Sequence, residues 1–329
     1  MRIRVAHGLF LAPALVACQA RTETPTPART VEVVVANQQS ASASILNADG
    51  LTVTNVTVGT GPHEAQVSPD GRTAVVTVYG TQTPGNQLAV IDLVRDSVIR
   101  TIDLGRYTRP HGVLFLGGSS SRVAVTSEAT NTVIIVDLAT GSVQPIPTNA
   151  RGSHMVAVNA DGTRAWTANI GDNNVSELDL VTGTFVRSYD GLPSRPEGIT
   201  VTPDGSEVWV GSNDTGAVTV ISTATGELAH TLTGARFPYR LGASPDGARV
   251  AIVDGMGNHL LIADVASKRI VTRVPLDSPR GVAIAEDNRT AWVTLGGGQV
   301  VEVDMDAGTV LRTIPVQASP DGVGVGSRR

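Results

Sequence analysis

Residues 196–210 read Pro-Glu-Gly-Ile-Thr-Val-Thr-Pro-Asp-Gly-Ser-Glu-Val-Trp-Val. Apolar and polar side chains alternate on both sides of the Thr-Pro-Asp-Gly segment, which predicts two β-strands joined by a tight turn. Glycine suits such a turn because it adopts positive φ without steric cost. The stretch is therefore predicted to be a β-hairpin.

The same pattern recurs from position 62 onward. Its copies begin at Pro62, Pro110, Ser153, Pro196, Pro238, Pro279 and Pro320, so successive starts lie 41 to 48 residues apart. A period in the forties with several short strands per copy is typical of a β-propeller. We therefore predict an all-β, seven-bladed β-propeller with four-stranded blades over residues 30–329.

The two ends of this region are incomplete copies that complement each other. Residues 31–37, 41–47 and 51–58 match the second, third and fourth strands of the repeat, with a turn at 48–50. Residues 322–325 match a first strand. We predict a closure blade built from both termini, which would leave no open sheet edge.

A targeting segment is predicted before the repeats. Residues 1–4 are a short basic start, and residues 5–17 are mostly apolar but too few to span a bilayer. We interpret residues 1–17 as a signal peptide and residues 18–29 as a lipidated cysteine followed by a Pro/Thr tether.

Cys18 completes the sequence Leu-Val-Ala-Cys, which resembles a bacterial lipoprotein lipobox. The resemblance implies cleavage before Cys18, acylation of its sulfur and anchoring of the protein to a membrane outside the cytoplasm. Gln19 replaces the aspartate that signals inner-membrane retention, so the outer membrane is favoured in a Gram-negative cell. An ordinary secretory signal with an incidental cysteine is the alternative.

Composition excludes several classes of protein. The 25 basic and 30 acidic residues give a net charge of −5, which argues against a general nucleic-acid binder. Because Cys18 is the single cysteine, a monomer has no disulfide and no cysteine-based metal site.

The repeats also resemble a known family. Residues 131–141 read Asn-Thr-Val-Ile-Ile-Val-Asp-Leu-Ala-Thr-Gly and residues 68–71 read Ser-Pro-Asp-Gly. Both are similar to motifs of the YVTN-repeat seven-bladed β-propellers, and three tryptophans stand where that family often has tyrosine: Trp166, Trp209 and Trp292. The resemblance implies the fold from about residue 31 to the end, but the fold does not identify a function.

The starts of the first strands are predicted to converge on one mouth of the central channel. The position after the leading residue of each copy is occupied, in chain order, by His63, His111, His154, Glu197, Tyr239, Arg280 and Asp321. Several arginines lie nearby in the sequence: Arg109, Arg151, Arg195, Arg236 and Arg240.

One hypothesis for this mouth is a transition-metal site. His63, His111 and His154 with Glu197 form a plausible ligand set for a divalent ion. Histidines that only pack near the channel are the alternative. Residues on adjacent blades are also expected to lie several ångströms too far apart to share one ion.

A second hypothesis is an anionic small-molecule site, because the arginine fork matches carboxylates and phosphates. Arginines solvated in loops are the alternative.

A third hypothesis is a lactonase-like enzyme with a histidine as base, Glu197 as its partner, and Arg195 or Arg240 as oxyanion stabiliser. No Gly-x-Ser-x-Gly nucleophile motif is present.

We predict a non-catalytic binding or interaction platform for an unidentified protein or anionic small molecule. A channel-mouth enzyme, either lactonase-like or metal-dependent, is the alternative.

Other recurring residues have structural interpretations. The aspartates of the turns and third strands are interpreted as turn caps, and the three tryptophans as packing between blades. The longest irregular excursion is expected at Gly80–Gln87.

Overall fold

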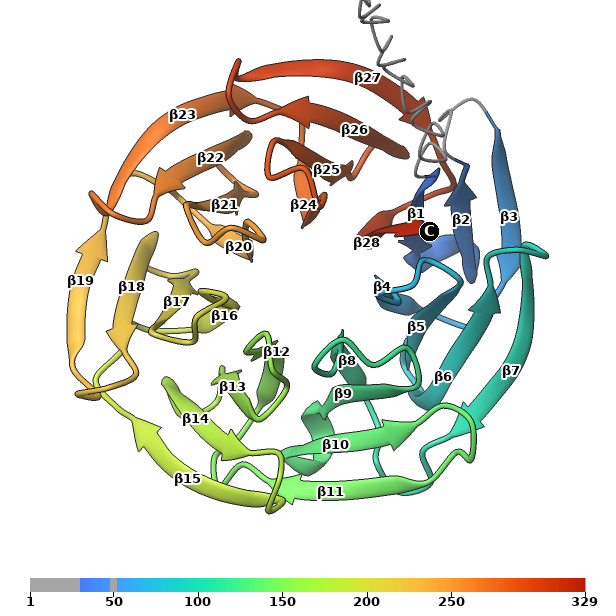
Figure 1. Cartoon of the computed structure of the whole chain (residues 1–329), viewed down its shortest axis with the longest axis horizontal. Coiled ribbons are helices and arrows are strands. Elements are labelled where there is room, and N and C mark those ends of the chain that lie inside the picture. Colours follow the sequence, from blue (N-terminus) through green and yellow to red (C-terminus); the bar gives the residue numbers. More distant parts are fainter. Residues whose placement is uncertain (1–29, 48–51, 329) are drawn as a thin grey trace, which may run out of the picture.

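The computed structural model describes residues 30–47 and 52–328. Within these ranges, 28 strands form seven four-stranded antiparallel sheets, which are arranged as a ring (Figure 1). The predicted all-β, seven-bladed β-propeller is confirmed. The predicted signal peptide, Cys18, the predicted tether and the predicted turn at 48–50 lie outside the described residues. No helix in the described ranges is long and apolar enough to cross a membrane.

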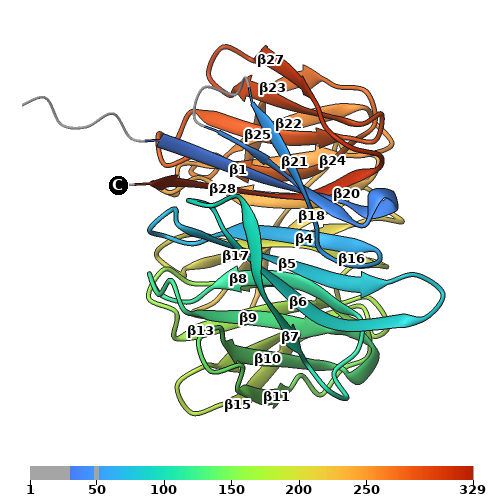
Figure 2. The same ribbon diagram turned by 90° about the vertical axis from the view of Figure 1, so that its right-hand side faces the viewer.

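One blade contains strands from both ends of the described chain. Its strand order is β28 (Pro320–Arg328), β1 (Thr30–Asn37), β2 (Ser42–Leu46) and β3 (Val53–Thr57). β1 and β28 pair antiparallel, with Val33 opposite Val325, and lie side by side in Figure 2. The predicted closure blade is confirmed, and a short 3-10 helix, Gln38–Ser40, joins β1 to β2.

The other six blades each follow the chain from the channel outward. The first three contain β4 (Pro62–Val67), β5 (Thr73–Gly80), β6 (Pro84–Asp92) and β7 (Ser97–Asp103); β8 (Pro110–Phe115), β9 (Arg122–Ser127), β10 (Thr132–Asp137) and β11 (Val143–Pro147); and β12 (Ser153–Val158), β13 (Arg164–Asn169), β14 (Asn174–Asp179) and β15 (Thr184–Tyr189). The last three contain β16 (Pro196–Val201), β17 (Glu207–Ser212), β18 (Ala217–Ser222) and β19 (Leu228–Leu232); β20 (Pro238–Ala243), β21 (Arg249–Asp254), β22 (His259–Asp264) and β23 (Arg269–Pro275); and β24 (Pro279–Ile284), β25 (Thr290–Leu295), β26 (Gln299–Asp304) and β27 (Thr309–Pro315).

The hydrophobic cores lie between neighbouring blades. Trp166 of β13 packs with Ile199 and Val208 of the next blade, and Trp209 packs in turn with residues of the blade after it. Trp292 packs against β1 of the closure blade. All three indole side chains are almost fully buried. The predicted packing of the tryptophans between blades is confirmed.

The recurring aspartates act as turn caps, as predicted. The Asp204 carboxylate accepts a hydrogen bond from the backbone N–H of Ser206, two residues along the chain. At the end of a third strand, Asp137 accepts bonds from the N–H groups of Ala139 and Thr140. Such local bonds hold the reversals in place and explain why the acids recur with the repeat.

The expected irregular excursion at Gly80–Gln87 is wrong. β5 and β6 extend through most of it, and Gly80 pairs with Pro84, so only residues 81–83 form the turn. The backbone of this segment is therefore paired within its own hairpin. Figure 2 shows the hairpin projecting at the face where β4 begins.

A glycine allows β28 to approach β4 closely. A Cβ atom on Gly324 would lie 2.7 Å from Cα of Gln66, whereas a Cβ atom at the same repeat position on β20, Gly242, would have no neighbour nearer than 3.8 Å.

We expect Gly324→Ala to lower the free energy of unfolding by about 1–3 kcal/mol, because the added methyl group overpacks the contact between β28 and β4. Gly242→Ala, the matched control, is expected to change it by less than about 0.5 kcal/mol. Urea denaturation measures both, and equal effects would contradict this account of the closure.

Candidate functional site

The first strands all begin at one mouth of the channel, and their early side chains meet there. Five of the predicted site residues are buried: His63 is 9% exposed, His111 1%, Glu197 5%, Arg240 3% and Asp321 3%. The side chain of His154 is 12% exposed. The predicted mouth is therefore a nearly closed polar cluster.

The three histidines stack on one another. The ring centroids of His63 and His111 lie 4.0 Å apart, and those of His111 and His154 lie 3.7 Å apart. The expectation that residues of adjacent blades lie too far apart to share an ion is wrong. The blades converge toward the channel axis, so their inner side chains come within ligand-sharing distance.

Asp321 orients His63. Its Oδ2 lies 2.9 Å from Nδ1 of the His63 ring. Burial acts to raise the pKa of Asp321, but the charges of His63 and Arg240 outweigh it and hold this pKa below its usual value. A carboxylate at Nδ1 favours a proton on that nitrogen and leaves Nε2 with a free lone pair.

His154 contacts two carboxylates. Its Nδ1 lies 3.1 Å from Oε2 of Glu128, and its Nε2 lies 3.4 Å from Oε1 of Glu197. Burial lowers the pKa of His154, but its hydrogen bonds with both acids outweigh burial and raise the pKa above its usual value. The Tyr79 hydroxyl also donates to Glu128, at 3.0 Å.

His111 lacks such partners. Its ring is buried between His63 and His154, and among the described residues neither ring nitrogen has a hydrogen-bond partner. Burial and then the neighbouring charge of His154 lower the pKa of His111 well below its usual value, so its imidazole is neutral. A buried polar group without a partner is costly and calls for an explanation.

Arg240 joins opposite sides of the channel. Its Nη2 lies 2.7 Å from Glu64 of β4, and its Nη1 lies 3.1 Å from Glu197 of β16. Burial raises the pKa of Glu64, and the charge of Arg240 opposes that rise. The ion pairs connect segments 176 and 43 residues apart in the sequence.

Sequence reasoning missed Glu64 and Glu128. In a regular strand Glu64 would face away from its neighbour His63. The pairing of β4 with β5 shifts register between Pro62 and Ala65. Such an irregularity changes the direction in which the side chains between these residues, including that of Glu64, point. Glu128 begins a 3-10 helix, Glu128–Thr130, after β9, which repeat alignment did not single out. The available signal was an acid directly following one of the predicted histidines.

The other predicted arginines lie apart from the Arg240 ion pairs with Glu64 and Glu197. Arg109 lies over the Tyr79 ring, and Arg195 is half exposed, 3.9 Å from Asp214. Arg151 pairs with Asp172, and the charge of Arg280 acts on Asp321. Tyr239 stacks under the Arg240 guanidinium. An anionic ligand at this mouth stays a prediction.

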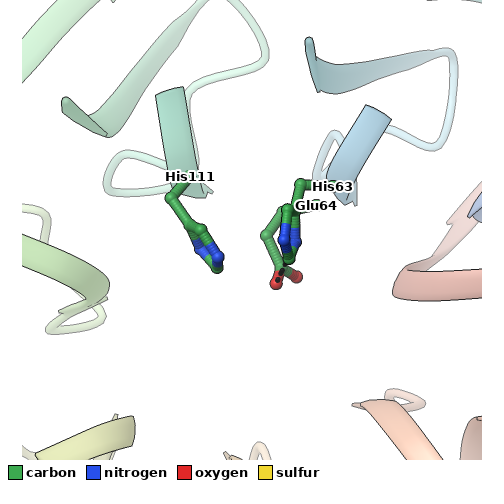
Figure 3. Close-up of side chains that lie close together, drawn as sticks. All are labelled: His63, Glu64 and His111. Carbon is green, nitrogen blue, oxygen red and sulfur yellow. Dashed lines mark ion pairs between the residues drawn. The ribbon is translucent and has the colours of Figure 1, made fainter. Parts of the chain in front are cut away.

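Two groups of side chains have the geometry of a metal site. His63, Glu64 and His111 form one, and Figure 3 shows them projecting from two neighbouring inner strands toward the same point. His111, Glu128 and His154 form the other. Within each group the potential ligand atoms all lie within 4.8 Å of one another. His111 is common to both.

The charge of the cluster favours a cation. Four carboxylates, those of Glu64, Glu128, Glu197 and Asp321, contact the histidines or Arg240, so their negative charges outnumber the positive charge of Arg240 even when His154 is protonated. Acids brought together in a poorly solvated site repel one another, and a bound cation relieves that repulsion. Imidazole nitrogen and carboxylate oxygen are both ligands for divalent transition metals.

Comparison with known proteins identifies the fold and no family. No protein-family model matches the chain, and no curated protein matches it. Among solved structures, the chain is similar to a chain of Kuenenia stuttgartiensis hydrazine synthase, with a TM-score of 0.69 and 18% sequence identity. The similarity covers 80% of this chain and 89% of that one. At this identity it supports the propeller fold alone, and the YVTN-repeat resemblance stays a prediction.

The ion pairs of Arg240 lead to a stability prediction. We expect Arg240→Met to lower the free energy of unfolding by about 3–5 kcal/mol, because it leaves buried carboxylates without their counter-charge. Arg195→Met is the matched control, and we expect it to change stability by less than about 0.5 kcal/mol because Arg195 is half exposed. Both are measured by urea denaturation at neutral pH. An unchanged urea midpoint for Arg240→Met would contradict the role assigned to this arginine.

Proposed function

We propose that this protein binds a divalent transition-metal ion at the channel entrance through His63, Glu64 and His111. The observation that carries the proposal is His111, a buried imidazole with no hydrogen-bond partner for either ring nitrogen among the described residues. Its two neighbours in the group provide a second imidazole and a carboxylate within ligand-sharing distance. A metal ion would satisfy the orphaned nitrogen and reduce the negative charge of the cluster.

The ligand set and its surroundings suit such an ion. Two histidines and one carboxylate are a common donor set for zinc and for non-haem iron, and they leave coordination positions open. Asp321 would act as the outer carboxylate that fixes the tautomer and orientation of His63. His154 already contacts Glu128 and Glu197, which makes it the less available of the three imidazoles.

We propose binding as the role of this site, in keeping with the predicted binding platform. A metal is favoured over an anion because the Arg240 guanidinium already faces Glu64 and Glu197. The enzymatic alternative, including a lactonase-like reaction, would use the same residues. It would need a substrate to reach a group whose ligands His63 and Glu64 have side chains only 11% exposed.

Metal binding has a direct test on residues 21–329, which contain every described strand. We expect about one equivalent of Zn²⁺ or Co²⁺ to bind, and His111→Ala to weaken binding by more than about 100-fold, since a ligand is lost. Asp321→Asn should weaken it by about 10–100-fold, because the orienting charge on His63 is lost. Titration calorimetry measures affinity, and visible absorption of bound Co²⁺ reports its ligands.

The control is His230→Ala, which removes an exposed histidine on β19, the outermost strand of its blade. It should bind metal like the unsubstituted protein. Circular dichroism establishes that each variant is folded. Folded protein that binds none of Zn²⁺, Co²⁺, Ni²⁺ and Cu²⁺, or that binds them equally after His111→Ala, would overturn the proposal.

We further propose that the propeller acts outside the cytoplasm, held to a membrane by lipid at Cys18. The support is the lipobox-like sequence at residues 15–18 and the Pro/Thr segment after it. β1 begins at Thr30 beside Arg328, at the end of β28 opposite the histidine mouth. An anchor preceding Thr30 would therefore join the face remote from the metal cluster.

Anchoring is tested in cells grown with an alkyne-tagged fatty acid. We expect the protein to incorporate the tag and Cys18→Ser to abolish incorporation, because the thiol is the acylation site. Ser119→Ala, a substitution in the turn between β8 and β9, is the control and should leave labelling unchanged. Labelling that persists in Cys18→Ser would contradict lipidation at this residue.

A further inference from the structure

A cavity of about 460 Å³ occupies the channel behind the metal cluster. Glu64 and Arg240 line one end of it, and Ala160, Pro203 and Pro245 line the other. The last three residues lie in the turns that follow first strands, on the face opposite the histidine mouth. The cavity therefore runs from the buried cluster to that opposite face.

The walls of the cavity are mainly apolar. Most lining residues come from the seven first strands and are alanine, valine, leucine or isoleucine. Leu114 of β8, Gln66 of β4 and Gly242 of β20 line the cavity and belong to none of the described core clusters between blades. These positions face the channel, and substitutions there alter the cavity more than the blade packing.

The inner end of the cavity is polar and is formed by the Glu64–Arg240 ion pair. Glu64 presents carboxylate oxygens there, and Arg240 presents guanidinium N–H groups, with 2.7 Å between them. A charged ligand of either sign would meet a like charge and would lose its hydration in an apolar channel. A neutral group that both donates and accepts hydrogen bonds meets neither penalty.

We propose that this cavity binds a small neutral amphiphile, with its apolar body along the channel and a hydroxyl end at Glu64 and Arg240. Cavities of about 300–1,000 Å³ with apolar walls and few polar groups are typical of small-molecule sites. The binding site is distinct from the metal group, of which it shares only Glu64.

The position of the opening fits such a ligand. It lies on the face where β1 begins and β28 ends. Under the proposed anchor at Cys18 this face is the one nearest the membrane, where neutral amphiphiles partition. That orientation rests on the proposed localisation, whereas the cavity and its polar end do not depend on it.

The test uses 1-octanol, octanoate and octylamine with residues 21–329, by titration calorimetry in metal-free buffer. We expect octanol to bind at least about tenfold more tightly than either charged analogue, because the charged group of octanoate or octylamine loses its hydration on burial. Each methylene should add about fourfold in affinity, so 1-hexanol should bind about 15-fold more weakly than octanol. Tighter binding of either charged analogue, or no binding of octanol, would overturn the proposal.

Channel-filling variants locate the site. Leu114→Trp should weaken octanol binding by at least about tenfold, because the indole occupies the ligand's space. Leu228→Trp, the same change on exposed β19, is the matched control and should bind normally. If Leu114→Trp does not fold, Gln66→Trp fills the channel from β4. Equal octanol binding by folded channel and control variants would overturn the proposal.

The His111→Ala variant distinguishes the cavity from the metal site. His111 does not line the cavity, so His111→Ala should lose metal binding and keep octanol binding. Loss of octanol binding in folded His111→Ala would show that the two sites are one and would overturn the separate cavity. Octanol binding without any metal binding would instead overturn the metal site alone.

Discussion

The Arg240 guanidinium joins three parts of the ring at its centre. It contacts Glu64 on one side of the channel and Glu197 on a neighbouring first strand, and it is almost fully buried. Without it, the carboxylates at the mouth would face one another in a poorly solvated space. Its single positive charge holds them together but does not neutralise them, and the cluster keeps a negative formal charge.

That residual charge shapes the rest of the site. His154 contacts Glu128 and Glu197, and His63 contacts Asp321, so two of the three imidazoles already have carboxylate partners. His111, between them, has none among the described residues. A neutral imidazole beside several acids is a group suited to a metal ion, and this is why the proposed site centres on His111.

The symmetry of the repeats is broken where the site lies. On four of the first strands, β8, β16, β24 and β28, the residue two positions after the start is a glycine, at 112, 198, 281 and 322. Close contacts leave little space for a side chain there. The corresponding positions on β4 and β20 are Glu64 and Arg240, which pair across the channel. The same backbone scaffold thus supports close packing in some blades and a polar cluster in others. Behind the cluster, small and branched apolar side chains leave the channel open.

Much of the fold follows from local rules. The Pro-Asp-Gly turns, the alternating strands and the 41–48-residue spacing are short-range signals, and each repeat carries them independently. They predict the blades, the closure by both termini, the turn-capping aspartates and the buried tryptophans. The excursion at Gly80–Gln87 was misjudged because polar composition does not exclude cross-strand pairing, which extends β5 and β6.

The site was predictable in part, because the repeat marks the residue after each strand start and so identifies His63, His111, His154, Glu197 and Asp321. Glu64 escaped because its orientation depends on a register shift against β5, and the pairing of Arg240 with Glu64 depends on contact across the channel. Spacing along a chain determines which strands form, since strand and turn preferences are local. Distances across the ring depend on blade tilt and packing, and these determine whether separate side chains become a single cluster.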